Sequence, residues 1–248
     1  MRLTVLGCSP SWPNPGEASS GYLVETSDAR LLLDCGNGVL GRLRALSDAP
    51  PTAIVLSHLD PDHISDLWSV MFGVRYGPLP WSGRTTLYAP PGGRVVLDEI
   101  LGGFGLRLRD LEQAVAVSEY RTTQATPVAS ATLTFGRTKH SSHSYATRIE
   151  DGGRALVYTG DATLTPGLVE HARGADLLLG EAGAGLLPPD PTGVHMTATE
   201  TAGLARDAGV ERLVLTHLSA EDREGSLAAA RTIHAATELA LPGAVFEI

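Results

Sequence analysis

Short apolar runs recur along this chain, and turn-forming or polar residues separate them. Runs rich in branched apolar side chains indicate β-strands, whereas longer segments with apolar residues at helical spacing indicate amphipathic helices. The pattern predicts strands at residues 3–6, 22–26, 30–33, 53–56, 85–88, 132–135, 145–149, 156–159, 177–179, 213–215 and 245–246. It predicts helices at residues 39–46, 64–76, 94–101, 164–173, 197–208 and 226–239. Strands and helices therefore alternate over much of the chain, which is typical of α/β proteins.

Several of the apolar runs are followed closely by a side chain that can bind a metal ion. These residues are Asp34, His58, Asp161, Glu181 and His217. The alternative explanation is structural, because strands of any protein tend to end on polar residues. If that were the only cause, Ser, Lys, Asn and Gly would follow these runs as often as Asp, Glu and His do. Buried strands that end on such groups gather them at one edge of a sheet, where sites in α/β proteins form.

The densest group of such residues lies at positions 57–63, which read Ser-His-Leu-Asp-Pro-Asp-His. Because these positions follow the apolar run 53–56, a strand that ends there would place all the ligands in one tight loop. His58 and Asp60 would lie on one side of the loop, and Asp62 and His63 on another, which suits two neighbouring cations. An ordinary polar turn is the alternative, but this density of ligands favours a metal site.

The amino-acid composition is compatible with a metal site in a globular α/β protein. The chain has 248 residues, of which 43% are hydrophobic and 19% charged, so we expect one globular domain spanning residues 1–248. The formal net charge is -9 and Lys139 is the only lysine, so no basic stripe is available to attract nucleic acid. A basic patch could still be assembled from scattered arginines such as Arg75, Arg84, Arg107 and Arg109, so the global charge constrains partners only weakly.

The first residues, the length of the apolar stretches and the two cysteines indicate where the protein is located in the cell. The first residues contain no apolar core long enough for a signal peptide, and no stretch approaches the roughly 20 apolar residues of a membrane span. We therefore expect a cytoplasmic protein with no membrane partner. Cys8 and Cys35 could pair in principle, but a chain of this length needs no disulfide, so we expect two buried or partly buried thiols.

Four ordered motifs carry a resemblance to a known family. They read SHLDPDH, TKHSSHSYATRIE, VYTGDA and VLTHL, and LLLDCGNG, LLLGEAG and HMTATETAGLARDAGVERLVLTHL extend the agreement beyond the ligands. The set resembles the metallo-β-lactamase-fold hydrolases, in the branch that includes ribonuclease Z and related phosphodiesterases. The resemblance covers essentially the whole chain. It implies an α/β fold, a four-layer αββα sandwich built from two β-α halves with the metals at one edge.

The resemblance also implies a ligand set for two divalent ions. The first ion would be bound by His58, Asp60 and His140. The second would be bound by Asp62, His63 and His217, and Asp161 would bridge the two. Imidazole and carboxylate ligands without thiolates suit Zn²⁺ first, with Mn²⁺ or Fe²⁺ as alternatives.

Asp60 is the position at which this sequence departs from the family, which usually has histidine there. The motif is therefore HxDxDH instead of HxHxDH. A carboxylate is harder and anionic, so it would lower the Lewis acidity of the first ion and shift selectivity toward Mn or Fe. The alternative is that Asp60 points away and leaves the first site weak.

The implied reaction is hydrolysis by a hydroxide that bridges two cations about 3.5 Å apart. Asp62 would both bind metal and accept a hydrogen bond from this nucleophile. The leaving oxygen needs a proton or a positive partner, and Glu181 with His195 matches the pair found in the ribonuclease Z branch. This pair adds weight to phosphodiester cleavage over generic hydrolysis.

The leading functional hypothesis is a dinuclear metal-dependent phosphodiesterase for a small phosphodiester or a cyclic nucleotide. The alternatives are a tRNA 3′-processing endoribonuclease, a lactone or thioester hydrolase, and a metal-binding carrier with little turnover. RNA is not favoured, because the sequence contains no inserted basic arm. The resemblance also implies a possible homodimer, because dimerisation is common in this superfamily, and the segment 68–81 could serve as an apolar contact or a substrate lid. His143 is left open between a role at the site and a solvent-facing loop position.

Overall fold

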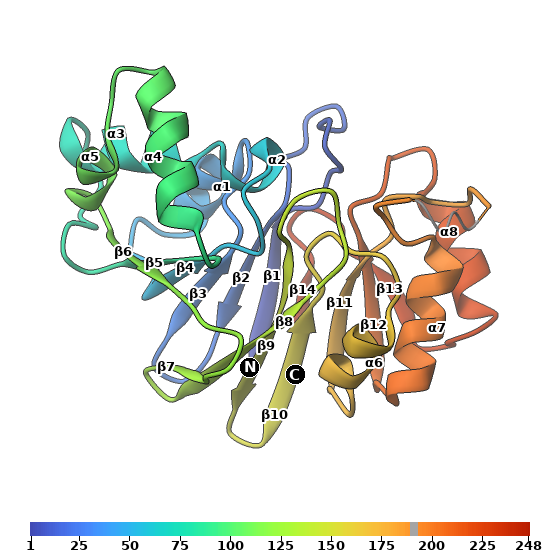
Figure 1. Ribbon diagram of the computed structural model, residues 1–248. Helices are drawn as coiled ribbons and strands as arrows, with labels where there is room; N and C mark the ends of the chain where they lie inside the picture. Colours follow the sequence, from blue (N-terminus) through green and yellow to red (C-terminus); the bar gives the residue numbers. More distant parts are fainter. Residues whose placement is uncertain (189–192) are drawn as a thin grey trace.

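Two seven-stranded β-sheets pack face to face, and helices cover both outer faces (Figure 1). This computed structural model describes residues 1–188 and 193–248. Helices α1 to α5 lie on the side of the first sheet, and α6 to α8 on the side of the second. The predicted four-layer αββα sandwich is confirmed.

The first sheet has the strand order β14-β1-β2-β3-β4-β5-β6. Its strands are β1 (Arg2–Gly7), β2 (Gly21–Glu25), β3 (Arg30–Leu33), β4 (Ala53–Val55), β5 (Thr86–Ala89), β6 (Ala116–Glu119) and β14 (Val245–Glu247). The strands from β3 to β6 pair in parallel, and the others are antiparallel. Its helices are α1 (Val39–Leu46), α2 (Pro61–Ile64), α3 (Leu67–Arg75), α4 (Gly93–Gly103) and α5 (Leu108–Glu112).

The second sheet has the order β13-β12-β11-β10-β9-β8-β7 and repeats the same plan. Its strands are β7 (Thr126–Val128), β8 (Ala131–Arg137), β9 (Tyr145–Asp151), β10 (Arg154–Tyr158), β11 (Leu177–Glu181), β12 (Arg212–Thr216) and β13 (Thr237–Leu239). The strands from β10 to β13 are parallel, and those from β7 to β10 are antiparallel. Helices α6 (Pro166–Ala172), α7 (Ala198–Ala208) and α8 (Arg223–Arg231) cover its outer face.

The packing of β3 explains why its sequence is apolar throughout. Leu31 and Leu33 pack between the two sheets, whereas Leu32 packs beneath the helices of the first half. Leu177, Leu178 and Leu179 of β11 divide in the same way between the central core and the helical layer. Strands that are buried on both faces lose the alternation of apolar and polar residues, so a short continuous apolar run marks them.

The prediction of a helix at residues 226–239 is wrong in its second half. Helix α8 ends at Arg231, and Thr237–Leu239 forms β13, which pairs in parallel with β12. Ile233 and Leu239 both pack against the same core, so their apolar character is compatible with either structure. The strand pairing decides the outcome, because tertiary contacts override weak local propensity.

The segment 68–81, predicted as an apolar contact or lid, is only partly exposed. Trp81 is fully buried and donates its indole N–H to the carbonyl of Asp48 at 3.0 Å. Phe72 and Tyr76 are exposed on α3 and just after it, and their rings stack. Association of two copies through this face stays a prediction. Within the described residues, no helix combines the length and apolar character that spanning a membrane requires.

Candidate metal centre

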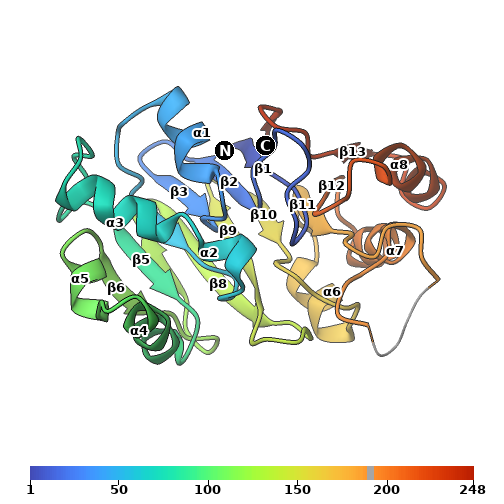
Figure 2. The same cartoon turned by 90° about the horizontal axis from the view of Figure 1, so that it is seen from above.

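The predicted ligands come together at one edge of the sandwich, where strands of both sheets end. His58 follows β4, Asp161 follows β10 and His217 follows β12. His140 lies in the loop between β8 and β9, and α2 carries Asp62 and His63. Figure 2 shows α2 near the middle of this edge, between the two groups of helices. The gathering expected from the strand ends is therefore present.

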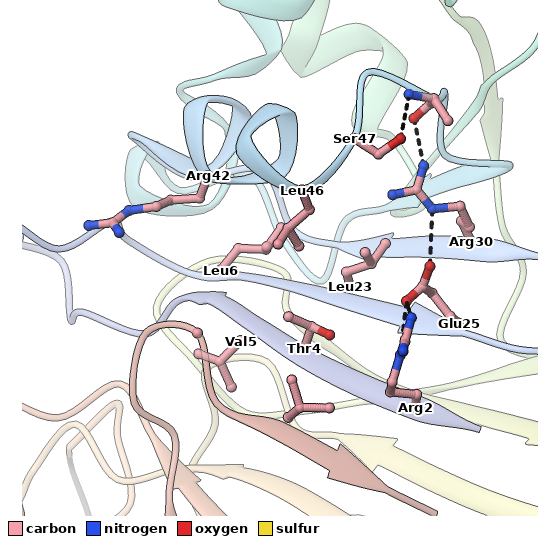
Figure 3. Close-up of a pocket in the computed structure, with 13 residues that line it drawn as sticks. Arg2, Thr4, Val5, Leu6, Leu23, Glu25, Arg30, Arg42, Leu46 and Ser47 are labelled. Atoms are coloured by element: carbon pink, nitrogen blue, oxygen red, sulfur yellow. Dashed lines mark hydrogen bonds and ion pairs between the residues drawn. The ribbon is translucent and has the colours of Figure 1, made fainter.

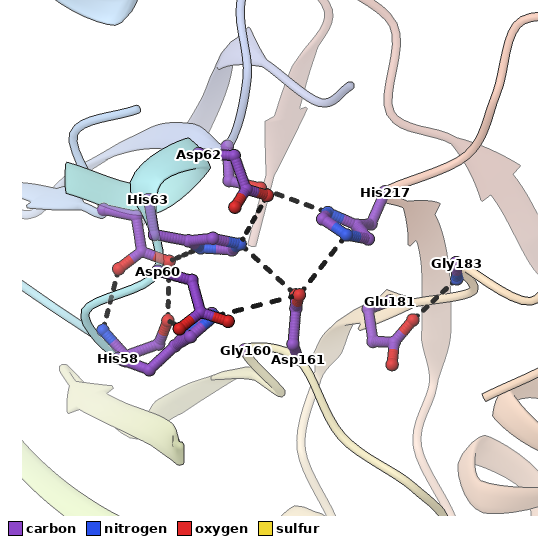
Figure 4. Close-up of polar contacts among 12 residues, drawn as sticks. His58, Asp60, Asp62, His63, Gly160, Asp161, Glu181, Gly183 and His217 are labelled. Carbon is purple, nitrogen blue, oxygen red and sulfur yellow. Dashed lines mark hydrogen bonds and ion pairs between the residues drawn. The ribbon is translucent and has the colours of Figure 1, made fainter. Parts of the chain in front are cut away.

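The carboxylate of Asp161 lies at the centre of this group (Figure 4). Its Oδ2 lies 3.3 Å from Nε2 of His217 and 3.8 Å from Nε2 of His58, and its Oδ1 lies 3.4 Å from Nε2 of His63. Two compact sets of ligand atoms result, and within each set all atoms lie within 4.8 Å of one another. One set contains Asp62, His63, Asp161 and His217, and the other contains His58, His140 and Asp161. Asp161 is common to both, as a bridging ligand would be.

Asp60 lies beside the second of these sets. Its Oδ2 lies 3.3 Å from Nε2 of His140 and 3.5 Å from Nε2 of His58. It does not point away from the site, but it falls outside the compact set that His58 and His140 form with Asp161. The geometry therefore keeps Asp60 within reach of a cation that these two imidazoles would hold.

The buried polar atoms of the group have unused bonding capacity. Among the described residues, the atoms without a hydrogen-bond partner include His58 Nε2, His63 Nε2, Asp62 Oδ2 and Asp161 Oδ1. Four orphaned buried atoms in one place would be costly in a protein, where such groups are normally paired. All four face the same small volume, so a cation bound there would satisfy them together.

The ring nitrogens on the far side of the imidazoles fix which nitrogen faces the centre. Nδ1 of His140 lies 2.9 Å from the carbonyl oxygen of Val194, and Nδ1 of His63 lies 2.7 Å from Oδ2 of Asp34. Both partners can only accept, so each Nδ1 carries a proton, and in the neutral ring the lone pair is on Nε2, which faces the centre. Neutral imidazoles with a free Nε2 are the form that binds metal, so the residues fit divalent ions.

A family profile described as Beta-lactamase superfamily domain matches residues 29–218. The chain belongs to the beta-lactamase superfamily. It is 34% identical to YhfI of Bacillus subtilis, a probable metallo-hydrolase, over 88% of this chain and 87% of that protein. Ribonuclease Z of Mycobacterium bovis is 30% identical over 88% of this chain and 85% of the relative. The crystal structure of YhfI, a metallo-beta-lactamase fold protein, matches with a TM-score of 0.87 and 28% identity over 99% of both chains.

These comparisons confirm the resemblance. The chain is a metallo-hydrolase of the beta-lactamase superfamily, and this fold implies divalent metal ions. The individual ligands and their roles stay predictions, which the distances around Asp161 support.

The buried carboxylates and imidazoles of the centre shift one another's pKa. Burial alone would raise the pKa of Asp161, but the imidazoles of His217 and His63 outweigh it and hold that pKa well below its ordinary value. Burial lowers the pKa of His63, but the carboxylates of Asp161 and Asp34 outweigh this effect and raise it well above its ordinary value. Buried carboxylates of this kind stabilise positive charge, which a divalent cation would supply.

Asp34 supports the centre from behind and is a residue whose role the sequence did not reveal. It is fully buried, and its Oδ2 accepts hydrogen bonds at 2.7 Å from His63 Nδ1, Ser57 Oγ and the Tyr158 hydroxyl. Its Oδ1 accepts the backbone N–H of Ser57 at 2.7 Å. Ser57 Oγ donates to Asp34 and lies 2.9 Å from Nδ1 of His58, so it orients that ring as well. The carboxylate therefore positions ligands of both sets.

Glu181 and His195, the predicted proton-donating pair, are in contact. Oε1 of Glu181 lies 3.3 Å from Nδ1 of His195 and also accepts the backbone N–H groups of Ala162 and Met196. Its Oε2 accepts the N–H of Gly183 at 2.6 Å. Glu181 is buried and all of these contacts engage its carboxylate, so it holds the ring of His195 in place.

His195 stands next to the metal ligands without being in either set. Its Nδ1 lies 3.8 Å from Oδ2 of Asp161, and its ring lies between those of His140 and His217, with centroids 5.2 Å from each. Burial lowers its pKa, but hydrogen bonding to Glu181 and the nearby carboxylates outweigh this, and the pKa rises to about 9. The structure also shows two buried free thiols, as predicted, at Cys8 and Cys35.

Gly36 allows the loop that carries the ligands to pack closely on the loop after β3. A Cβ at this position would clash with the carbonyl oxygen of Asp62. We therefore expect Gly36→Ala to lower the free energy of unfolding by about 1–3 kcal/mol, because either loop must move. Gly41→Ala is the matched control, since Gly41 lies on the exposed face of α1 and its added Cβ would meet no described atom within 4 Å outside the backbone of the helix itself. This variant should raise the free energy of unfolding by roughly 0.5–1 kcal/mol. Thermal unfolding of the two variants measures both effects, and a Gly36→Ala melting temperature at or above wild type would contradict the packing argument.

Proposed function

We propose that the chain is a dinuclear metal-dependent phosphodiesterase that acts on small phosphodiesters, such as cyclic nucleotides. The observation that carries the proposal is the contact of Glu181 with His195 beside Asp161. Such a pair supplies a proton to a leaving oxygen, which an alkoxide needs and which a metal site alone does not provide. The similarity to a ribonuclease Z supports phosphodiester chemistry, and the net charge of -9 favours small substrates over RNA.

Two divalent ions would be held by the two compact sets of ligand atoms, with Asp60 added beside one of them. His58, Asp60 and His140 would bind one, Asp62, His63 and His217 the other, and Asp161 both. Ions bound there would supply Lewis-acid stabilisation of the phosphoryl oxygens and an activated water, with Zn²⁺ as the first candidate.

The protein's own side chains would position the substrate and move its protons. Glu181 fixes the ring of His195, so that the imidazolium can donate a proton to the departing oxygen without reorienting. Asp62, whose Oδ2 lies 3.2 Å from Nε2 of His63, would accept a hydrogen bond from the attacking water. Prepositioned donors and acceptors of this kind stabilise developing charge because they need no reorganisation during the reaction.

The direct test is hydrolysis of bis(p-nitrophenyl) phosphate by protein loaded with Zn²⁺ or Mn²⁺. Metal analysis of the same preparation should give two ions per chain, as the proposal requires. Turnover that depends on added metal would support it. Two bound ions with no turnover would contradict it and leave lactone or thioester hydrolysis, or metal carriage, as alternatives.

His195→Ala tests the role of the proton donor. We expect phenyl phosphodiesters, whose leaving group needs a proton, to lose about a hundredfold in kcat/KM, and p-nitrophenyl esters less than about tenfold. Metal content should not change, because His195 lies in neither set of ligand atoms. Equal losses on both esters, or loss of metal, would show that His195 does not act as a proton donor.

A further inference from the structure

A cavity of about 240 Å³ adjoins the metal centre on the side of Asp60. It lies between the turn that precedes α4 and the loop that joins β8 to β9. Leu59, Pro90, Pro91 and Val96 give it apolar walls, and Ser142 and His143 provide its polar groups. Asp60 belongs both to this wall and to the surroundings of His140, so a substrate at the centre would extend directly into the cavity.

The lining of the cavity gives little support to an anionic ligand. No Lys or Arg is among the described residues that line it. The start of α4 is also engaged, because the N–H of Gly93 bonds to Pro90 and that of Arg94 bonds to Glu119. The guanidinium of Arg94 is bound to the carbonyl of Val117 at 2.7 Å and to Glu112 at 2.8 Å. Among the described residues, a second phosphate would therefore find no Lys or Arg side chain here to balance its charge.

The size and the lining of the cavity favour a single planar ring as its occupant. Sites that enclose a whole drug-sized ligand have about 300–1,000 Å³, so this cavity holds one ring system and not an entire nucleotide. An imidazole can stack on a planar base, and the apolar rings of two prolines can pack against one. Ser142 and His143 can hydrogen-bond to the polar edge of such a ring.

Other cavities match this chemistry less well. A cavity of about 530 Å³ lies on the outer face of the first sheet beside α1 (Figure 3). Its arginines already have partners there, since Arg2 and Arg30 pair with Glu25 and Arg42 donates to the carbonyl of Gly16. None of its lining residues is among the predicted metal ligands.

We propose that the cavity beside Asp60 binds an uncharged planar ring, of the nucleobase class, on one arm of the phosphodiester held at the metal centre. The proposal rests on the proposed function and narrows its substrate to phosphodiesters with a nucleoside arm. Val96 and His143 are then residues that determine specificity. His143 acts on the substrate and binds no metal, in keeping with its position outside both sets of ligand atoms.

Two esters with the same leaving group and charge test this assignment. Metal-loaded wild type should favour the p-nitrophenyl ester of thymidine 5′-monophosphate over methyl p-nitrophenyl phosphate by about tenfold in kcat/KM, as expected for one stacked base. Val96→Trp should fill the cavity and abolish this preference by raising KM for the thymidine ester alone. Val95→Trp is the matched control, because Val95 is the exposed neighbour on α4 and does not line the cavity. His143→Ala should reduce the preference and leave the metal content unchanged.

The assignment would be overturned by wild type with no preference, or by Val96→Trp with the preference of wild type. Failure of both esters to react would contradict the proposed phosphodiesterase and would not decide the cavity's role. Calorimetric binding to the metal-loaded protein then decides it. Thymidine 5′-monophosphate should bind about tenfold more weakly to Val96→Trp than to Val95→Trp, with binding of inorganic phosphate equal in the two. Equal affinities for the nucleotide would refute the assignment.

Discussion

Replacement of Asp161 by Asn is expected to lower kcat/KM for bis(p-nitrophenyl) phosphate about a thousandfold, which corresponds to about 4 kcal/mol. The carboxylate of Asp161 is buried and belongs to both sets of ligand atoms, so its loss weakens both metal sites at once. Asn keeps the shape of the side chain but not its charge, and His63 and His217 would face a neutral amide. Metal bound per chain should fall together with activity.

Asp207→Ala controls for the loss of one negative charge. Asp207 lies near the end of α7 and pairs there with its exposed neighbour Arg206. We expect this variant to keep the activity and metal content of wild type. Circular dichroism of the metal-free proteins should show that the Asp161→Asn variant is folded. An Asp161→Asn protein with full metal and normal kcat/KM would show that Asp161 is not the shared ligand.

The layers of the fold could be predicted from the sequence because strands buried on both faces are visible in it as short continuous apolar runs. Leu31–Leu33 and Leu177–Leu179 are apolar throughout because both faces of these strands are covered. The same rule failed for residues 233–239, where a short strand at the margin of the sheet has no such run. Its structure is decided by pairing with β12, which no local pattern records.

The candidate site was predictable where its ligands are close in sequence or follow a strand. His58, Asp60, Asp62 and His63 lie in one loop and its short helix, and the packing of α2 brings them together. The function of Asp34 was not predictable, although the sequence marked it as a residue at a strand end. Its role depends on Ser57 and Tyr158, and the Tyr158 hydroxyl reaches it from the opposite sheet. Contacts between sheets leave no periodic signal in the sequence.

Asp34→Asn is therefore the variant that tests the support of the centre. Asp34 has a left-handed backbone conformation, with φ of 58°, which Asn tolerates well, so the substitution adds little backbone strain. An amide oxygen can replace only part of the acceptor capacity of the carboxylate, and its NH₂ group would face donors. We expect the free energy of unfolding of the metal-free protein to fall by about 3 kcal/mol, because buried donors are left unpaired. Metal affinity should fall about 10–100-fold, because the ring of His63 loses the group that orients it.

Tyr158→Phe is the graded control, since it removes one donor and leaves the carboxylate with His63 and Ser57. Tyr158→Phe should lower the free energy of unfolding by about 1 kcal/mol. It should lower the metal affinity much less than Asp34→Asn does. Urea unfolding measures the stabilities, and competition with a chelator measures the affinities. If both variants lost stability equally while metal affinity stayed unchanged, Asp34 would serve only the packing between the sheets. A loss of affinity in Asp34→Asn alone would show that the carboxylate positions the metal ligands.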